Sequence, residues 1–266
     1  MEQFQDGHHV RLRSRERGTY LHADDDGLGV SIQRLRVSMN VAWLVHLYRG
    51  QYLLLQSAAY GGYLAVTGAP ARRGHRGLRV EQLSYYHPEV EPMLWQAVQL
   101  EGLFLNHFNS GNLRANGRYR RWNNGVSVDR IEDVNNISTM MHWVVEAIPA
   151  REIMPRLPRP LLLPIPAAML RPRLIMYVWP NIQGQGGLLN QGTFVFGGRS
   201  VFDLRNELAR RVELEVAQLV MCLRTRNGRL IPLLVDLPRS GQTLHIIIVI
   251  VGSPAHAALR YADVHA

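Results

Sequence analysis

Apolar and polar residues alternate along short stretches of the first half of the chain. Val10 and Leu12 are apolar, whereas Arg11 and Arg13 between and after them are charged. A period of two places one face of a strand in a dry core and the other face in water. No stretch before residue 149 shows the period of a helix, so the pattern predicts a region built from β-strands.

This first region also repeats itself. The segments 10–14 and 18–21 recur 43 residues later as 53–57 and 61–64, and a looser third copy covers 103–105 and 111–115. Each copy closes on a tryptophan within an apolar strand, at Trp43, Trp95 and Trp143. A unit of about 45 residues cannot bury its own apolar face, so three such units must share one core. The pattern predicts an N-terminal β-trefoil over residues 1–148.

Two Asn-Gly pairs stand in the third copy, at 116–117 and 124–125. Asn-Gly is typical of two-residue hairpin turns, because both central residues of a type I′ turn need a positive φ. Each pair therefore predicts a tight turn.

Proline dominates the next segment. Eight prolines occur between Pro149 and Pro180, a density that excludes a helix or a central strand. We therefore expect a stiff proline-rich linker over residues 149–172.

A different pattern follows over residues 173–266. Strands are expected at 174–179, 193–196, 219–225, 229–235 and 245–251, with one helix that begins at a Ser200 N-cap. Pro232 indicates an edge strand, and the continuous apolar run 246–251 indicates a central one. The order strand, strand, helix, strand, strand, strand predicts a C-terminal α+β domain of the β-grasp (ubiquitin-like) type.

The chain resembles a flowering-plant family called domain of unknown function 569. The resemblance lies in the opening segment 4–14, in Tyr20–Asp26, in Met140–Glu146 and in a second module that begins at Gly198. It implies a trefoil of the fascin-like, actin-cross-linking class, with a binding or scaffolding role and no known catalytic activity. Fascins combine four trefoils, whereas this chain shows one, and cross-linking filaments needs at least two binding surfaces.

Charge and cysteine content narrow the choice of partners. The formal charge is +9, yet residues 1–149 hold 16 Arg against 14 acids, a net of +2, so nucleic acid is an unfavoured partner. All 30 basic residues are Arg, which codon bias or avoidance of lysine modification would each explain. The single Cys222 favours a reducing compartment, the cytoplasm or the nucleus. No apolar run approaches the roughly 20 residues of a membrane span, and no signal peptide is recognised.

Two polar clusters are candidate contact sites for a ligand or partner: Asp24, Asp25 and Asp26 in one turn, and Arg118, Arg120, Arg121 and Trp122 in another. For the first, a solvated turn is the alternative, since Leu35 stands where a calcium loop needs its last carboxylate. For the second, a solvated hairpin is the alternative. Function is expected where the three copies differ, which adds the insertion at Arg72–Arg79.

We therefore expect a non-enzymatic intracellular binding or scaffold protein with a protein partner, actin among the candidates. The alternative is a lectin that binds carbohydrate or another small ligand. Lectins of the trefoil type carry Gln two residues before each repeat tryptophan, where this chain has Val41, Met93 and Met141. No catalytic residue, metal site or cofactor is expected. The outer face of the β-grasp sheet needs a cover, for which the trefoil or a second copy in a homodimer is predicted.

Overall fold

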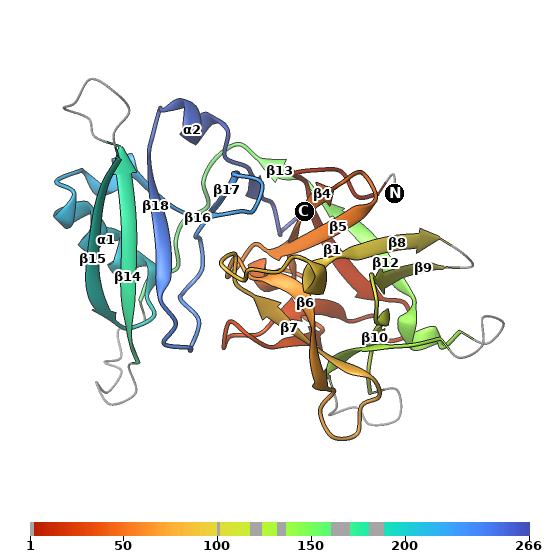
Figure 1. Ribbon diagram of the computed structural model, residues 1–266. Helices are drawn as coiled ribbons and strands as arrows, with labels where there is room; N and C mark the ends of the chain where they lie inside the picture. The colour runs from red at the N-terminus through yellow and green to blue at the C-terminus, as the bar shows by residue number, and fades with distance from the viewer. Residues whose placement is uncertain (1–2, 100–101, 118–123, 132–136, 161–170, 181–188) are drawn as a thin grey trace. The chain divides into compact units, whose positions relative to one another are not determined.

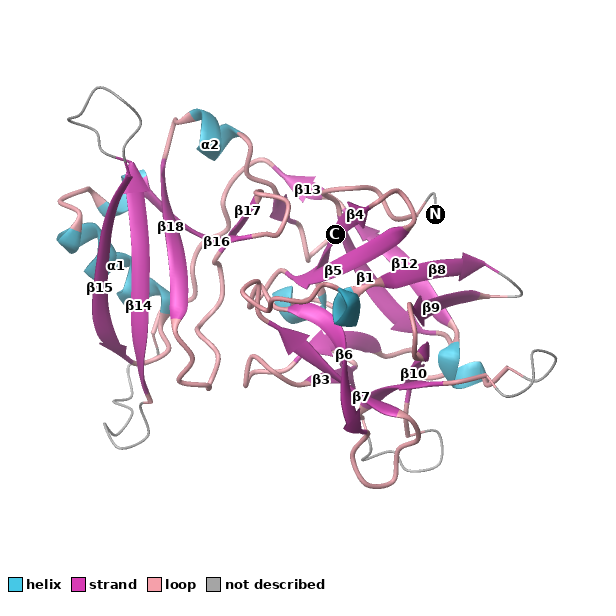
Figure 2. Cartoon of the chain, in the orientation of Figure 1, coloured by secondary structure: helices cyan, strands magenta, loops and turns pink. Residues whose placement is uncertain are grey.

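The chain folds into two compact units in a computed structural model (Figure 1). The structure describes residues 3–99, 102–117, 124–131, 137–160, 171–180 and 189–266. The first unit comprises residues 1–150 together with 262–266, and the second comprises residues 151–261. Strands predominate in both (Figure 2).

The first unit is built on a closed ring of six antiparallel strands. Around the ring the neighbours are β1–β4, β4–β5, β5–β8, β8–β9, β9–β12 and β12–β1. The strands are β1 (His9–Ser14), β4 (Trp43–Tyr48), β5 (Tyr52–Ser57), β8 (Trp95–Gln99), β9 (Leu103–His107) and β12 (Trp143–Ile148). Each repeat contributes two ring strands, which confirms the predicted trefoil.

The three repeat tryptophans occupy equivalent places in the barrel core. Trp43 and Trp95 are 0% exposed and Trp143 is 2% exposed. Their indole N–H groups donate to the carbonyl oxygens of Leu21, Leu64 and Leu113, at 3.2, 2.8 and 2.9 Å. A short 3-10 turn precedes each tryptophan: Met39–Val41, Glu91–Met93 and Thr139–Met141. The repeated Leu and Trp positions therefore encode the fold.

Three hairpins close one end of the barrel, one from each repeat. They are β2 (Tyr20–Ala23) with β3 (Val30–Gln33), β6 (Tyr63–Pro70) with β7 (Leu78–Leu83), and β10 (Gly111–Ala115) with β11 (Val126–Asp129).

Neither Asn-Gly pair of the third repeat forms the predicted type I′ turn, because neither Asn116 nor Asn124 has a positive φ. The backbone N–H of Asn116 donates to the carbonyl of Gly125, so the two pairs face each other and extend the β10–β11 hairpin. Asn116 is 5% exposed, and its side chain donates to Ser127 Oγ at 2.9 Å. These contacts fix both the backbone N–H and the side chain of Asn116 within the hairpin.

The second unit is a mixed five-stranded sheet with one long helix. The sheet order is β15-β14-β18-β16-β17, with β14 parallel to β18 and the other pairs antiparallel. The strands are β14 (Pro172–Pro180), β15 (Leu189–Gly197), β16 (Leu219–Arg224), β17 (Leu230–Pro232) and β18 (Leu244–Ile250). The helices are α1 (Val201–Arg211), α2 (Pro254–Ala257) and the 3-10 turn Val216–Gln218. The β-grasp prediction is confirmed.

Local sequence explains the elements of this sheet. Ser200 Oγ accepts the N–H of Asp203 at 3.0 Å and caps α1 as predicted. β18 lies in the centre, and β17, which contains Pro232, lies at the edge. One apolar face of the sheet packs on Leu204 and Leu208 of α1. Among the residues that the structure describes, no helix has the length and apolar character needed to cross a bilayer.

The opposite face of β16 and β18 is covered from within the same unit. Val220, Cys222 and Val249 form a buried cluster there, against which Met154 and Leu259 pack. Met154 belongs to the proline-rich segment, so the described part of that segment packs on the sheet. Neither the trefoil nor a second copy is needed over this part of the face.

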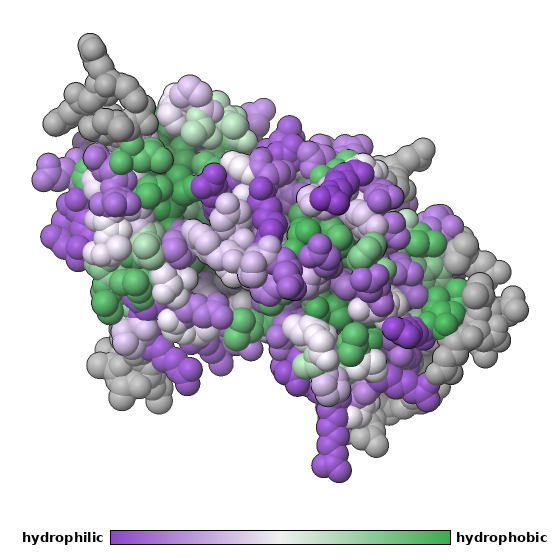
Figure 3. Space-filling model, in the orientation of Figure 1, coloured by the Kyte–Doolittle hydropathy of each residue, from purple (hydrophilic) through white to green (hydrophobic). Residues whose placement is uncertain are grey.

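Further along the same face, β14 and β15 expose apolar side chains. Leu174 is 41% exposed, Met176 37% and Val195 68%. Hydrophobic residues also stand out over this sheet in Figure 3. The homodimer through the β-grasp sheet stays a prediction, and these side chains mark the part of the face that it would use.

The structure draws the boundaries differently from the sequence. β13 (Ala150–Arg151), within the expected linker, pairs with β19 (Tyr261–Ala262), and residues 262–266 belong to the trefoil unit rather than to the β-grasp domain. Asp263 N–H donates to the carbonyl of Pro149 at 2.9 Å. The chain thus leaves and re-enters the trefoil unit at adjacent strands.

The burial of Cys222 leads to a testable prediction. Cys222 is 0% exposed, and desolvation raises the pKa of its thiol to about 12. At pH 8 the thiolate is then on the order of a thousandfold scarcer than in an unfolded chain, where the pKa is about 8.5. We expect Ellman's reagent to modify the native chain at least that much more slowly than the chain in 6 M guanidinium. Native and unfolded rates within a factor of ten would contradict the packing described here.

Candidate functional site

The tips of the three trefoil hairpins are joined to one another in a ring. The N–H of Gln82 donates to the carbonyl of Leu28 at 2.7 Å, and the N–H of Ile32 donates to the carbonyl of Asn124 at 2.8 Å. The third connection is the antiparallel pair β11–β7, in which Ser127 faces Arg79. Residues from all three repeats therefore meet around the pseudo-threefold axis.

A polar pocket of about 190 Å³ lies at this meeting point. It is lined by Asp24, Gly29, Val30, Ser31, Gln33, Arg72, His75, Arg79, Val80, Glu81, Asn124, Gly125 and Val126. The first hairpin contributes the acid Asp24, the second contributes two arginines and a histidine, and the third contributes an amide. The lining thus combines positively charged donors, negatively charged acceptors and a neutral amide.

Arg79 of β7 is only weakly paired with Glu81 of the same strand, so it retains hydrogen-bond donors for a ligand. Arg79 Nη1 lies 3.5 Å from Glu81 Oε1, a long ion pair in which the side chains are 41% and 32% exposed. The buried Nε of Arg79 has no hydrogen-bond partner. The exposed part of the Arg79 guanidinium, whose ion pair with Glu81 is long, can still donate to an incoming oxygen.

His75 reaches the third hairpin because Gly125 has no side chain. A Cβ placed on Gly125 would overlap the His75 imidazole ring. The glycine of the second Asn-Gly pair therefore makes room for a ring from another repeat. Its role is close packing at the pocket and not a turn.

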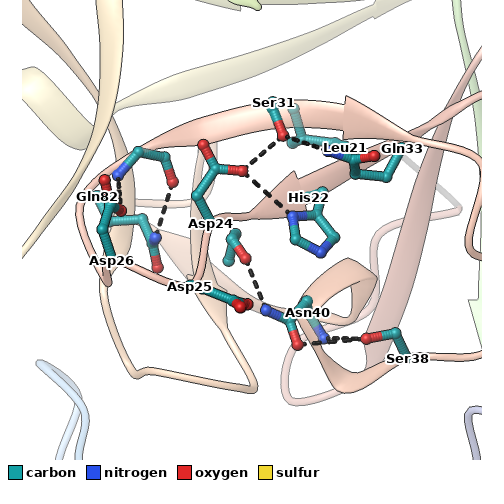
Figure 4. Close-up of polar contacts among 12 residues, drawn as sticks. Leu21, His22, Asp24, Asp25, Asp26, Ser31, Gln33, Ser38, Asn40 and Gln82 are labelled. Carbon is teal, nitrogen blue, oxygen red and sulfur yellow. Dashed lines mark hydrogen bonds and ion pairs between the residues drawn. The ribbon is translucent and has the colours of Figure 1, made fainter. Parts of the chain in front are cut away.

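The three aspartates of the turn make different contacts, and Figure 4 shows those of Asp24 and Asp26. Asp26 Oδ1 accepts the N–H groups of Leu28 and Gly29, at 2.9 and 2.7 Å, and so fixes the turn. Asp24 Oδ1 accepts Ser31 Oγ at 2.5 Å and lies 3.3 Å from His22 Nδ1.

Asp25 points elsewhere: Tyr60 Oη donates to its carboxylate at 3.4 Å. Of the three predicted aspartates, only Asp24 lines the pocket. For Asp26, the alternative of a structural turn describes its contacts better than a ligand contact does.

The predicted arginine cluster, Arg118, Arg120, Arg121 and Trp122, lies outside the described residues. The pocket residues that were not selected individually are Arg72, His75, Arg79, Glu81 and Asn124. The first three fall in the Arg72–Arg79 insertion, where the copies differ. The difference between the copies therefore indicates that this loop has a functional role. The sequence does not show that the loop and the Asp24 turn lie next to each other.

The pocket is suited to binding polar groups. Within the part of the chain that the structure describes, no group of three or more His, Cys, Asp or Glu side chains could hold a metal ion. Cys222 belongs to the second unit, far along the chain and buried.

The fold defines a protein of two modules, a β-trefoil and a β-grasp unit. The chain belongs to the family described as "Beta-trefoil domain of unknown function (DUF569)", whose model matches residues 1–154. A second model, "DUF569 associated ubiquitin-like domain", matches residues 171–249. Both agree with the resemblance inferred from sequence.

Solved structures resemble the chain over about half its length. A designed 3-fold symmetric protein, ThreeFoil, is 21% identical, with 52% of this chain and 96% of that one covered and a TM-score of 0.43. A Macrolepiota procera ricin B-like lectin, solved with lactose, is 17% identical, with 53% and 96% covered and a TM-score of 0.44. The SDF2-like protein from Arabidopsis thaliana is 18% identical, with 54% and 94% covered and a TM-score of 0.44. No curated protein matches the chain. Fascin-like character, actin binding, plant origin and location in the cell stay predictions.

Proposed function

We propose that the trefoil is a non-enzymatic intracellular binding module that takes one charged or polar group of a protein partner into the hairpin pocket. The observation that carries this proposal is the convergence of non-repeated polar residues from all three hairpins on one pocket. Core positions repeat because the barrel needs them three times. Arg72, His75 and Asp24 each occur in one copy, so the repeated barrel core does not require them.

The size of the pocket favours a group presented by a larger partner. Pockets for drug-sized ligands measure roughly 300–1,000 Å³, whereas this one measures about 190 Å³. It can hold one side chain or one small headgroup. The Arg72 and Arg79 guanidinium groups favour an acidic side chain, because charge-assisted hydrogen bonds to carboxylates are strong.

A sugar residue is the second candidate. The mixture of acceptors, Asp24 and Glu81, with the donors Arg79 and Asn124 suits the hydroxyl groups of a single sugar. However, no Phe, Tyr or Trp side chain is among the described residues that line the pocket, so a flat aromatic surface for the sugar ring is absent from that lining. This contrast makes the protein partner the preferred proposal.

Neighbouring arginines provide a matched test. Arg72 and the adjacent Arg73 are both exposed, but only Arg72 lines the pocket. Proteins retained by the immobilised wild-type chain would be identified, and their affinities measured for wild type, Arg72→Ala, Arg79→Ala and Arg73→Ala. We expect Arg72→Ala and Arg79→Ala to weaken the partner at least about tenfold, since a hydrogen bond to a charged group contributes about 1.5–3 kcal/mol. Arg73→Ala should bind as wild type does.

Two further arms decide the class of partner. Pelleting with actin filaments that Arg72→Ala abolishes and Arg73→Ala leaves intact would identify actin as the partner. A glycan-array hit with the same dependence would replace the protein proposal with the sugar-binding one. Equal affinities of all four chains for every retained protein would refute a role for the pocket.

A further inference from the structure

The junction between the first and second repeats of the trefoil departs from the other two. At each junction the residue before the repeat tryptophan accepts a backbone hydrogen bond from the next repeat. Ala58 N–H donates to Ala42 at 2.9 Å, Phe108 to Leu94 at 3.1 Å, and Arg15 to His142 at 2.9 Å. These three bonds identify equivalent positions.

Large side chains fill the second and third junctions. At the second, Leu54 and Leu94 belong to one buried apolar cluster. At the third, the rings of Phe104 and His142 lie 4.6 Å apart and meet edge to face. The first junction has two small residues, Ala42 and Ala58, and Arg11 stands in the place of Leu54 and Phe104. By itself, this junction has less side-chain volume than its equivalents.

The C-terminal segment fills that space. Ala262 and Val264 are 3% and 8% exposed and form one apolar cluster with Ala42, Ala58 and Ile148. In Figure 1 the C-terminus accordingly lies beside β4 and β5, the strands that flank this junction. The apolar side chains of the segment thus replace those missing from the first junction.

Arg11 recognises the backbone of the segment. Its side chain is 0% exposed, and Nη2 donates to the carbonyl of Val264 at 2.6 Å, with Nη1 3.4 Å from the carbonyl of Ala266. Burial, and then the charge of Arg36, lower the pKa of this guanidinium. A buried guanidinium is costly unless acceptors meet it, and both acceptors come from the C-terminal segment.

We propose that the first trefoil junction, formed by Arg11, Ala42, Ala58 and Ile148, is a peptide-binding site whose occupant is the chain's own segment 262–266. The site recognises a peptide with a small residue and a valine two positions apart, which turns after the small residue so that Ala266 N–H donates to the carbonyl of Asp263, and Arg11 donates to its backbone oxygens. The site is separate from the hairpin pocket, and its occupant lies outside both regions matched by the family models, which end at residues 154 and 249. The segment is therefore a peptide ligand that belongs to the same chain as its binding site.

The test supplies the segment as a separate molecule. A chain that ends at Tyr261 would be mixed with a synthetic acetylated peptide of residues 261–266, and binding would be followed by calorimetry and by the melting temperature. We expect this chain to melt below the full chain and the peptide to restore part of the loss. Arg11→Leu, which places the equivalent of Leu54 here, should weaken peptide binding at least about tenfold through loss of charged hydrogen bonds. The full chain, whose site is occupied, should bind the peptide at least tenfold more weakly.

A second variant keeps the proposal open to refutation if the shortened chain does not fold. Arg11→Leu, Ala42→Leu and Ala58→Phe together give the first junction the residues of the second, so the shortened chain should then fold and ignore the peptide. A shortened chain that melts as the full chain does would overturn the proposal. So would peptide binding that Arg11→Leu leaves unchanged, or a filled variant that also fails to fold without the segment.

Discussion

Trp95→Ala is expected to remove most of the stability of the trefoil unit. Trp95 is 0% exposed, and its indole is one of three that fill the barrel core. Truncating a buried tryptophan costs about 3–5 kcal/mol, and the buried carbonyl of Leu64 loses its donor, at about 1–3 kcal/mol more. Domains are stable by only about 5–15 kcal/mol, so a large fraction of this variant should be unfolded.

The measurement is urea denaturation followed by circular dichroism. Trp95→Phe is the control, because it retains most of the ring volume and loses the N–H donor. It should lose clearly less stability than Trp95→Ala. A free energy of unfolding for Trp95→Ala within about 1 kcal/mol of wild type would mean that the barrel is not packed on this residue, since core truncations of this size exceed that value.

Gly77→Ala is the second substitution expected to have a large effect. Gly77 has φ of +80°, and a Cβ there would overlap the carbonyl group of Val128 in the third hairpin. The strained backbone costs about 1–2 kcal/mol for a residue with a side chain, and the overlap forces β7 and β11 apart. We expect a loss of about 2–4 kcal/mol in all, and impaired binding at the hairpin pocket.

Gly74→Ala separates the two causes. Gly74 also has a positive φ, +89°, but a Cβ on it would meet nothing within 4 Å. It should therefore show the backbone cost alone and retain binding. If the two variants were equally stable, the close approach of the second and third hairpins would not matter to the fold.

The sequence predicts those parts of the fold that are specified more than once. The core residues of the barrel recur in all three repeats, so Trp43, Trp95 and Trp143 could be aligned from the sequence alone. The ubiquitin-like unit follows because helix capping at Ser200 and the long apolar run of β18 are local properties of the chain.

The features that escaped prediction depend on contacts between distant residues. Nothing local distinguishes Arg11 from other arginines that alternate with apolar residues on a strand, yet it is buried by a segment more than 250 positions away. The pocket is similar, since His75 and Asp24 become neighbours only when the hairpins close. The Asn124-Gly125 pair was predicted to form a turn, because a glycine that makes room for the His75 imidazole has the same sequence pattern as one in a turn.

The pairing of β13 with β19 has a consequence for how the two modules influence each other. Because the segment 262–266 is tied to the trefoil through residues 151–261, the compactness of that intervening stretch sets the effective concentration of the segment at its site. A folded ubiquitin-like unit holds its two ends at adjacent strands, whereas an unfolded one would let them wander, at an entropic cost that grows with loop length. The second module therefore acts as a tether for the segment, and we expect its folding to be thermodynamically linked to completion of the first.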